Sequence, residues 1–162
     1  MTITSSQADA LADELMRLEF NREPIGASMF GIPGYDDQLG DPSAAAEQDA
    51  CAQALAIAER ADGVDRSEVD AQDAVTLAVV AQQARSIADR IDSHMAEYTV
   101  TDLFIGPAAG LLTLLPMTAL PDNDRAQDYL TRLRGIPEYL AVTAERHREV
   151  YARAMAIHRR GR

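Results

Sequence analysis

The stretch that decides the fold is Ser67–Tyr98, SEVDAQDAVTLAVVAQQARSIADRIDSHMAEY. Apolar positions recur through it at alternating intervals of three and four residues, which places them on one face of a helix. Ser67, with Asp70 three residues later, is close to a capping box. We therefore expect one long helix here, packed side by side with antiparallel neighbours. Its buried face would consist of Leu77, Val80, Ala84, Ile87, Ile91, His94 and Tyr98.

Two helices are expected before this stretch. Ser6–Phe20 repeats apolar residues at helical spacing, and Ser5 or Ser6 would cap it. A second helix would have Asp41 as its N-cap and Pro42 at its first position, and would run to about residue 61. Gly63 is placed where a C-terminal glycine usually ends a helix.

Two more helices are expected after it. The run Asp122-Asn123-Asp124 caps a short helix that continues to about Arg134. Gly135 would end that helix, and Pro137 would open the last one, which reaches Ile157 or beyond.

Two segments interrupt the helices. Residues 21–42 are rich in glycine and proline, and residues 99–121 include an uncharged run, LFIGPAAGLLTLLPMTALP, at 103–121. The uncharged run is long enough to span a bilayer. Its repeated glycines and prolines favour a buried, broken segment over a membrane helix. The sequence thus predicts an all-α array of about five helices, with long antiparallel helices and two long irregular segments, in one helical domain over residues 1–162.

The charge is uneven along the chain. The net charge is −11. Residues 1–144 carry 24 acidic residues and 9 arginines, a net charge of −15, whereas residues 145–162 carry 6 arginines and 2 glutamates, a net charge of +4. An acidic body repels phosphate backbones and anionic lipids. The basic stretch suits the C-terminal end of a helix dipole. We therefore expect no nucleic-acid partner, no membrane partner and a cytoplasmic location.

Composition excludes several chemistries. The chain has no lysine, so Schiff-base and P-loop lysine mechanisms are ruled out. Cys51 is the only cysteine, so the chain forms neither an internal disulfide nor a cysteine-rich metal site. No catalytic residue, metal ligand or cofactor is therefore assigned to these residues.

Five residues remain as candidate cleft or contact positions. His94 and His147 fall on apolar helix faces, where a histidine is most often a neutral packing residue; a two-histidine site between adjacent helices stays the alternative. Tyr35, Asp36 and Asp37 loosely resemble a calcium or acid–base cluster, although aspartates also build turns.

Three stretches, in this order, carry a family resemblance. They are GIPGYDDQL at 31–39, followed by Asp41-Pro42-Ser43; the uncharged run from Ile105-Gly106-Pro107 to Leu115-Pro116; and YLTRLRGIPEYL at 129–140. Their order and spacing resemble the N-terminal portion of the bacterial domain-of-unknown-function 885 family.

The resemblance implies more than this chain contains. Members of that family are largely helical, several times longer, and similar to gluzincin-type metallopeptidases with a zinc-binding His-Glu motif far downstream. No His-Glu dipeptide occurs in these 162 residues, so no catalytic or metal residue can be carried over. Zinc is expected only in a longer family member.

Two functions are therefore expected from different classes. One is the N-terminal, non-catalytic region of a metal-dependent peptidase-like hydrolase, whose partner is the missing downstream catalytic region. The other is a free-standing helical module that binds a protein partner. The crowded leucines of residues 103–115 also predict an exposed apolar surface and a homo-oligomer rather than precipitation.

Overall fold

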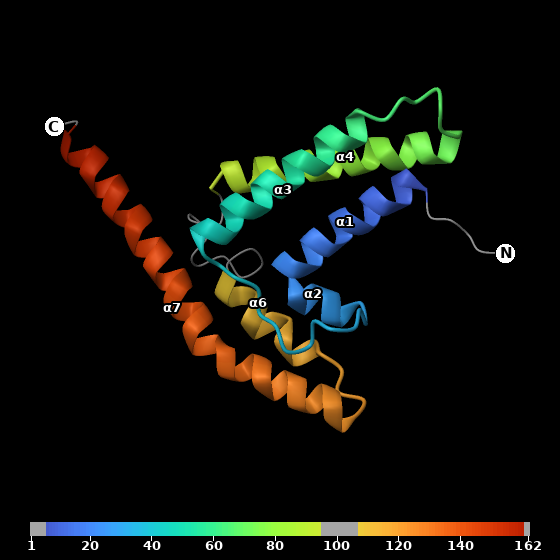
Figure 1. Cartoon of the computed structure of the whole chain (residues 1–162). Coiled ribbons are helices and arrows are strands. Elements are labelled where there is room, and N and C mark those ends of the chain that lie inside the picture. The colour runs from blue at the N-terminus through green and yellow to red at the C-terminus, as the bar shows by residue number, and fades with distance from the viewer. Residues whose placement is uncertain (1–5, 95–106, 161–162) are drawn as a thin grey trace. The chain divides into compact units, whose positions relative to one another are not determined.

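The computed structural model describes residues 6–94 and 107–160, and within those ranges it is all-α (Figure 1). The described residues form six α-helices and one 3₁₀ helix, and they include no strand. The predicted fold class is confirmed. The helices are α1 (Gln7–Arg22), α2 (Pro24–Met29), α3 (Ala44–Asp62), α4 (Ala71–Asp92), α6 (Pro107–Thr113), η1 (Leu115–Met117) and α7 (Asn123–Arg160).

Contacts along the backbone divide the chain into two compact units. Unit 1 comprises Met1–Arg22 and Glu47–Ser93, and unit 2 comprises Glu23–Ala46 and His94–Arg162. Each unit is described by itself below. The expectation of one domain over the whole chain stays a prediction.

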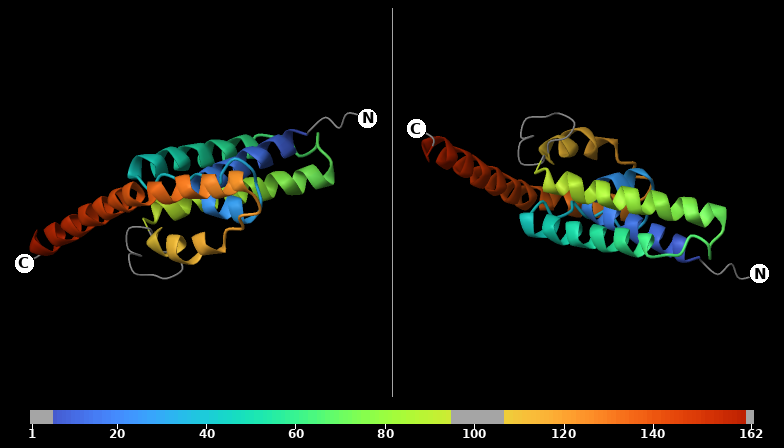
Figure 2. Two further views of the ribbon diagram at one scale, coloured as in Figure 1. Left: turned by 90° about the horizontal axis from the view of Figure 1, so that it is seen from below. Right: turned by 90° about the horizontal axis from the view of Figure 1, so that it is seen from above.

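Unit 1 is a bundle of α1, α3 and α4, whose ribbons lie side by side in all views (Figure 2). Leu77, Ile57 and Leu11 are at most 1% exposed and form the centre of its core. Small alanines fill most of the remaining buried positions, and alanine at a contact lets helix axes approach closely. The other buried members are Ala8, Leu15, Leu18, Ala50, Ala54, Ala58, Ala61, Val80, Ala81, Ala84, Ile87 and Ile91.

Polar contacts show how the three helices run. Ser6 donates to Asp73 and Arg90 donates to Glu19, so α1 and α4 are parallel. The ion pair Arg85–Asp62 joins the end of α3 to the middle of α4. Cys51, early in α3, lies 3.8 Å from the Asp92 carboxylate at the end of α4, so α3 and α4 are antiparallel.

Two helix starts differ from the prediction. The α3 helix begins at Ala44 because Ser43 caps it, its hydroxyl accepting from the Ala46 N–H at 3.1 Å; Asp41 instead accepts from the Ser43 N–H in the preceding turn. The α4 helix begins at Ala71 with Asp70 as its N-cap. Ser67 does not cap it, because its hydroxyl donates to Asp65. In both cases a neighbouring Asp or Ser caps the helix in place of the residue that was predicted to do so.

The α4 helix also ends earlier than predicted, at Asp92. The five apolar residues predicted on its buried face up to Ile91 are all buried. His94 follows the helix with a φ of 52°, in the left-handed region that turns the chain away from the helix axis. His94 is therefore exposed, and its predicted place on the buried face is wrong. Tyr98 lies outside the described residues.

Unit 2 contains a helix that the sequence did not predict. The α2 helix lies inside residues 21–42, with Pro24 at its first turn, where a missing N–H costs nothing. It ends in a Schellman motif: the Gly31 N–H bonds to the Ser28 carbonyl and the Ile32 N–H to the Ala27 carbonyl, both at 3.0 Å. The irregular stretch between α2 and α3 is therefore limited to residues 30–43, and we call it the 30–43 segment.

Replacing Gly31 by alanine is expected to destabilise unit 2 by about 1–2 kcal/mol, because Gly31 has a φ of +74°. A Cβ there would meet nothing within 4 Å, so the cost is purely conformational. Gly26, inside α2, is the matched control, and Gly26→Ala should gain up to about 1 kcal/mol. All five tyrosines belong to unit 2, so tyrosine fluorescence during urea unfolding reads this unit. Equal effects of the two substitutions on stability would contradict the left-handed conformation of Gly31.

The last two predicted helices are one helix. The α7 helix runs unbroken over 38 residues, with Pro137 inside it, and Figure 1 shows its ribbon bending along the way. Pro137 removes one backbone hydrogen bond, which bends a helix without ending it when the flanking turns are held. Gly135 has a packing role, because a Cβ there would lie 3.3 Å from the Leu39 side chain. The predicted helix end at Gly135 is therefore wrong.

The uncharged run is helical in part. Residues 107–113 form α6 and residues 115–117 form η1. Leu111 and Leu115 are buried with Ile25, against Leu39, Leu133, Ile136 and Tyr139. Leu112 is 76% exposed and Met117 is 65% exposed, so the run is only partly buried. Residues 103–106 lie outside the described residues. No helix in the part of the chain that the structure describes is long and apolar enough to cross a membrane.

Candidate functional site

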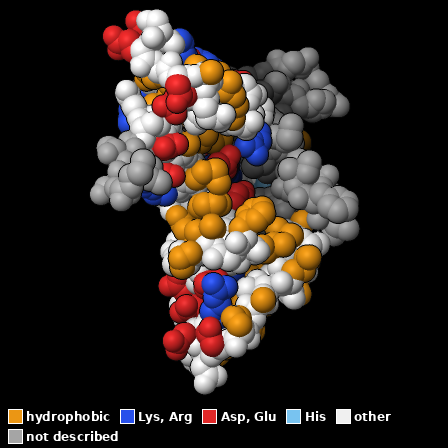
Figure 3. All heavy atoms as spheres, turned by 90° about the vertical axis from the view of Figure 1, so that its right-hand side faces the viewer, with side chains coloured by type: hydrophobic (Ala, Val, Ile, Leu, Met, Phe, Trp, Pro, Cys, Tyr) orange, Lys and Arg blue, Asp and Glu red, His pale blue; other side chains and the backbone are white. Residues whose placement is uncertain are grey.

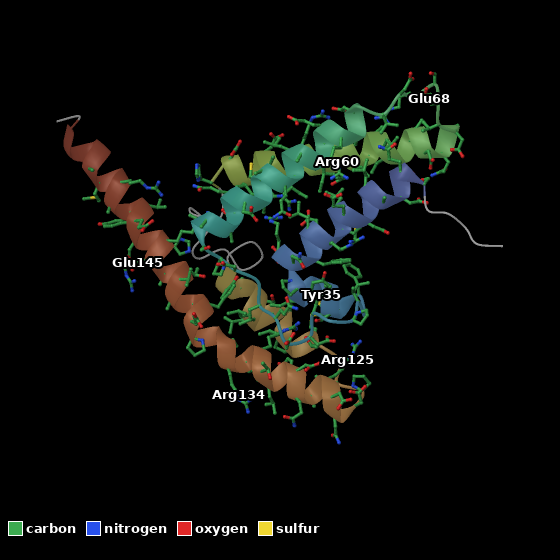
Figure 4. The ribbon with its side chains drawn as sticks, in the orientation of Figure 1. Tyr35, Arg60, Glu68, Arg125, Arg134 and Glu145 are labelled. Carbon is green, nitrogen blue, oxygen red and sulfur yellow. The ribbon has the colours of Figure 1, made fainter. Side chains whose placement is uncertain are left out.

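The candidate site lies in unit 2, where the 30–43 segment meets α7. Of the three clustered candidates, Asp36 is 7% exposed, Tyr35 is half-buried, and Asp37 faces solvent. Figure 4 shows Tyr35 and Arg125 on facing elements of this unit. The cluster is therefore not one set of carboxylates on a common ligand, because Asp36 points inward and Asp37 does not.

The centre of the site is Arg132 of α7, whose side chain is completely buried. Its Nη2 donates to the Ser28 hydroxyl at 2.6 Å and to the Tyr35 carbonyl oxygen. One guanidinium nitrogen thus holds the end of α2 and the middle of the 30–43 segment. A buried arginine is stable only when its charge and its donors are compensated.

Asp36 supplies the compensating charge. Burial lowers the pKa of the Arg132 guanidinium, and the negative charge of Asp36 opposes that shift most strongly. The Asp36 Oδ2 itself forms an ion pair with Arg125, at 3.6 Å from its Nε. Among the described residues, Nε and Nη1 of Arg132 and Oδ1 of Asp36 find no hydrogen-bond partner. Both buried groups are therefore incompletely hydrogen-bonded, so removing the charge of either one is costly.

Seven-residue spacing links the α7 residues that contact this part of the chain. Arg125, Arg132, Tyr139 and Arg146 follow one another at that interval, so they share one broad helix face. Arg146 donates to the Pro42 carbonyl oxygen at 3.2 Å. Burial raises the pKa of Tyr139 to about 12, with a further contribution from the charge of Glu23. The face thus contacts the chain from Ser28 in α2 to Pro42, just before α3.

Sequence reasoning missed Arg132, because an arginine in a helical pattern is usually exposed. The seven-residue spacing is the signal that could have identified Arg132, because it places this arginine on the helix face that is expected to be buried. The two histidines are not at this centre: His94 is exposed beyond α4, and His147 is half-buried on α7. The predicted burial of His94 is therefore wrong, and His147 is only partly buried.

The chemistry of the site is that of a structural clamp. Guanidinium groups donate hydrogen bonds and carry a fixed charge, and they are neither nucleophiles nor bases at neutral pH. Within residues 6–94 and 107–160, no three His, Cys, Asp or Glu side chains gather closely enough to hold a metal ion. The geometry therefore defines a buried arginine that, with the Arg125–Asp36 ion pair, positions an irregular segment against a long helix.

The fold and this centre define an all-α protein with a helical bundle and a second unit built around a clamped segment. The chain belongs to the family described as "Bacterial protein of unknown function (DUF885)", whose model matches residues 24–160. That match covers every described element after α1, including the 30–43 segment and all of α7. No curated protein and no solved structure matches the chain significantly.

Proposed function

We propose that this chain is a non-catalytic helical region of a metal-dependent, peptidase-like hydrolase, and that it acts by packing against the catalytic region. The observation that carries the proposal is the family match over residues 24–160, in a chain without a His-Glu dipeptide. The hydrolase class rests on the resemblance of the three motifs. A cytoplasmic location, and the lack of a nucleic-acid or membrane partner, belong to the same proposal.

Exposed apolar side chains in unit 2 support a packing role. Phe30, Leu112 and Met117 are 81%, 76% and 65% exposed. Figure 3 shows hydrophobic side chains gathered on the lower half of one face of the molecule. Apolar surface of this kind marks interaction sites. The same observation favours the second candidate function, a free-standing helical module that binds a protein partner.

The first test is zinc binding. We expect the purified chain, incubated with zinc and then dialysed, to retain well below one zinc per chain and to hydrolyse no peptide library with zinc present. The reason is that tight zinc sites need three or four preorganised ligands. One zinc per chain that is lost in His94→Ala or His147→Ala would contradict the non-catalytic assignment.

A second measurement separates the two candidate functions. A His-Glu-containing catalytic region from a longer family member is supplied as a separate polypeptide. Co-elution with this chain, together with higher peptide hydrolysis than the catalytic region shows alone, supports the hydrolase region. Co-elution should weaken in Leu112→Ser and not in Val75→Ser, an exposed apolar residue of unit 1. Absence of any complex favours the free-standing module.

A further inference from the structure

The buried guanidinium of Arg132 has more hydrogen-bond donors than the surrounding protein groups accept. A guanidinium carries five N–H bonds. Nη2 uses two of them, one to the Ser28 hydroxyl and one to the Tyr35 carbonyl oxygen. Nε and Nη1 carry the others, and among the described residues they find no acceptor. The side chain is 0% exposed, so bulk solvent does not reach these donors. Buried donors in folded proteins are satisfied by protein groups or by ordered water.

The carboxylate of Asp36 has the opposite deficit. Its Oδ1 is buried and accepts no hydrogen bond from the described residues, whereas its Oδ2 pairs with Arg125. Asp36 directly follows Tyr35, whose carbonyl oxygen is bound by Arg132. Its charge also acts on the pKa of Arg132 more strongly than any other charge does. One region of unit 2 therefore holds buried donors that lack acceptors and a buried acceptor that lacks a donor.

These two deficits define the ligand that fits the region. An anion would accept from Arg132, but Asp36 would repel it and Oδ1 would gain no donor. A cation would be repelled by the guanidinium. The ligand must be neutral, must both accept and donate hydrogen bonds, and must be small because both groups are buried. Water meets these requirements, and internal water makes about three hydrogen bonds to buried polar groups of this kind.

We propose that unit 2 binds internal water between Arg132 and Asp36, where it accepts from Nε or Nη1 of the arginine and donates to Oδ1 of the carboxylate. This water joins the 30–43 segment to α7 in addition to the direct bonds of Arg132 and the ion pair of Arg125. It satisfies both buried groups without a direct contact between them. The proposal does not depend on the proposed hydrolase relation.

A high-resolution crystal structure of the full chain is the direct test. We expect ordered water about 2.7–3.2 Å from Nε or Nη1 of Arg132. The same water, or one hydrogen-bonded to it, should lie at a similar distance from Oδ1 of Asp36. Electron density for an anion at this place, a protein acceptor on the arginine nitrogens, or the absence of water from both groups overturns the proposal.

Nuclear magnetic resonance with ¹⁵N-labelled arginine tests the proposal in solution. The guanidinium N–H signals of Arg132 are assigned by their loss in Arg132→Lys. We expect them to show a cross-peak to water with the sign of a dipolar contact, because a buried water stays beside them. Exposed Arg134 should show exchange with solvent only. The cross-peak should persist in Ser28→Ala, which removes a nearby hydroxyl that could relay proton exchange.

A pair of variants tests the role of Asp36. Asp36→Leu removes the acceptor, so the water cross-peak of Arg132 should be lost. Asp37→Leu is the matched control, because Asp37 is the exposed neighbour, and it should leave the cross-peak unchanged. Far-UV circular dichroism verifies that each variant is folded. A cross-peak that is missing from the unaltered chain, that Ser28→Ala abolishes, or that Asp36→Leu leaves intact overturns the proposal.

Discussion

Replacing Arg132 by methionine is expected to lower the free energy of unfolding of unit 2 by about 3–5 kcal/mol, because it removes a positive charge that offsets the buried Asp36 carboxylate and the donor of two buried hydrogen bonds. Methionine matches the volume but leaves the Asp36 carboxylate buried with only Arg125, at 3.6 Å. The Ser28 hydroxyl and the Tyr35 carbonyl oxygen lose their donor as well. Tyrosine-detected urea unfolding measures the change in this unit.

A second variant separates the charge from the shape. Arg132→Met combined with Asp36→Asn removes both charges, so it should be less destabilised than Arg132→Met alone. Arg134→Met, two residues along the same helix but exposed, should change the stability by less than about 0.5 kcal/mol. Arg134 projects from α7 away from the other elements of unit 2 (Figure 4). If the double variant is no more stable than the single one, Asp36 is not the residue that compensates Arg132.

The sequence was most informative where burial follows a local period. Leu77, Val80, Ala84, Ile87 and Ile91 all lie in the core because a helix repeats its buried face every three or four residues. The end of that helix was not predicted. The pattern continued to His94 and Tyr98, whereas the backbone turns into the left-handed region at His94. Apolar spacing describes a face and does not locate the residue at which a helix stops.

Unit 2 was less predictable because distant residues decide its local structure. Gly135 and Pro137 are breakers by local rules, yet α7 passes through both. Leu39 packs against the space that Gly135 leaves open. Asp36 was a candidate because Tyr35 and Asp37 stand beside it in the sequence. The charges that stabilise its buried carboxylate come from Arg132 and Arg125, which are far away in the sequence. Local propensity yields to tertiary contacts of this kind.

Leu77→Ala is expected to cost about 2–5 kcal/mol, because Leu77 is fully buried in the centre of unit 1 and the cavity can close only partly. Its neighbours include many alanines, which have no side-chain freedom with which to fill the space, so a value in the upper half of that range is expected. Far-UV circular dichroism during urea unfolding measures the loss.

Val75→Ala on the same helix is the control for Leu77→Ala, since Val75 is 58% exposed and should change the stability by less than about 0.5 kcal/mol. Unit 1 contains no tyrosine, so its unfolding is visible by circular dichroism and silent in tyrosine fluorescence. If the units unfold separately, Leu77→Ala shifts only the part of the circular dichroism change that has no counterpart in tyrosine fluorescence, and it leaves the tyrosine transition in place. Arg132→Met then shifts the tyrosine transition. Close helix packing should prevent the alanine-rich core from rearranging around the cavity. A cost below about 1 kcal/mol for Leu77→Ala would contradict this expectation.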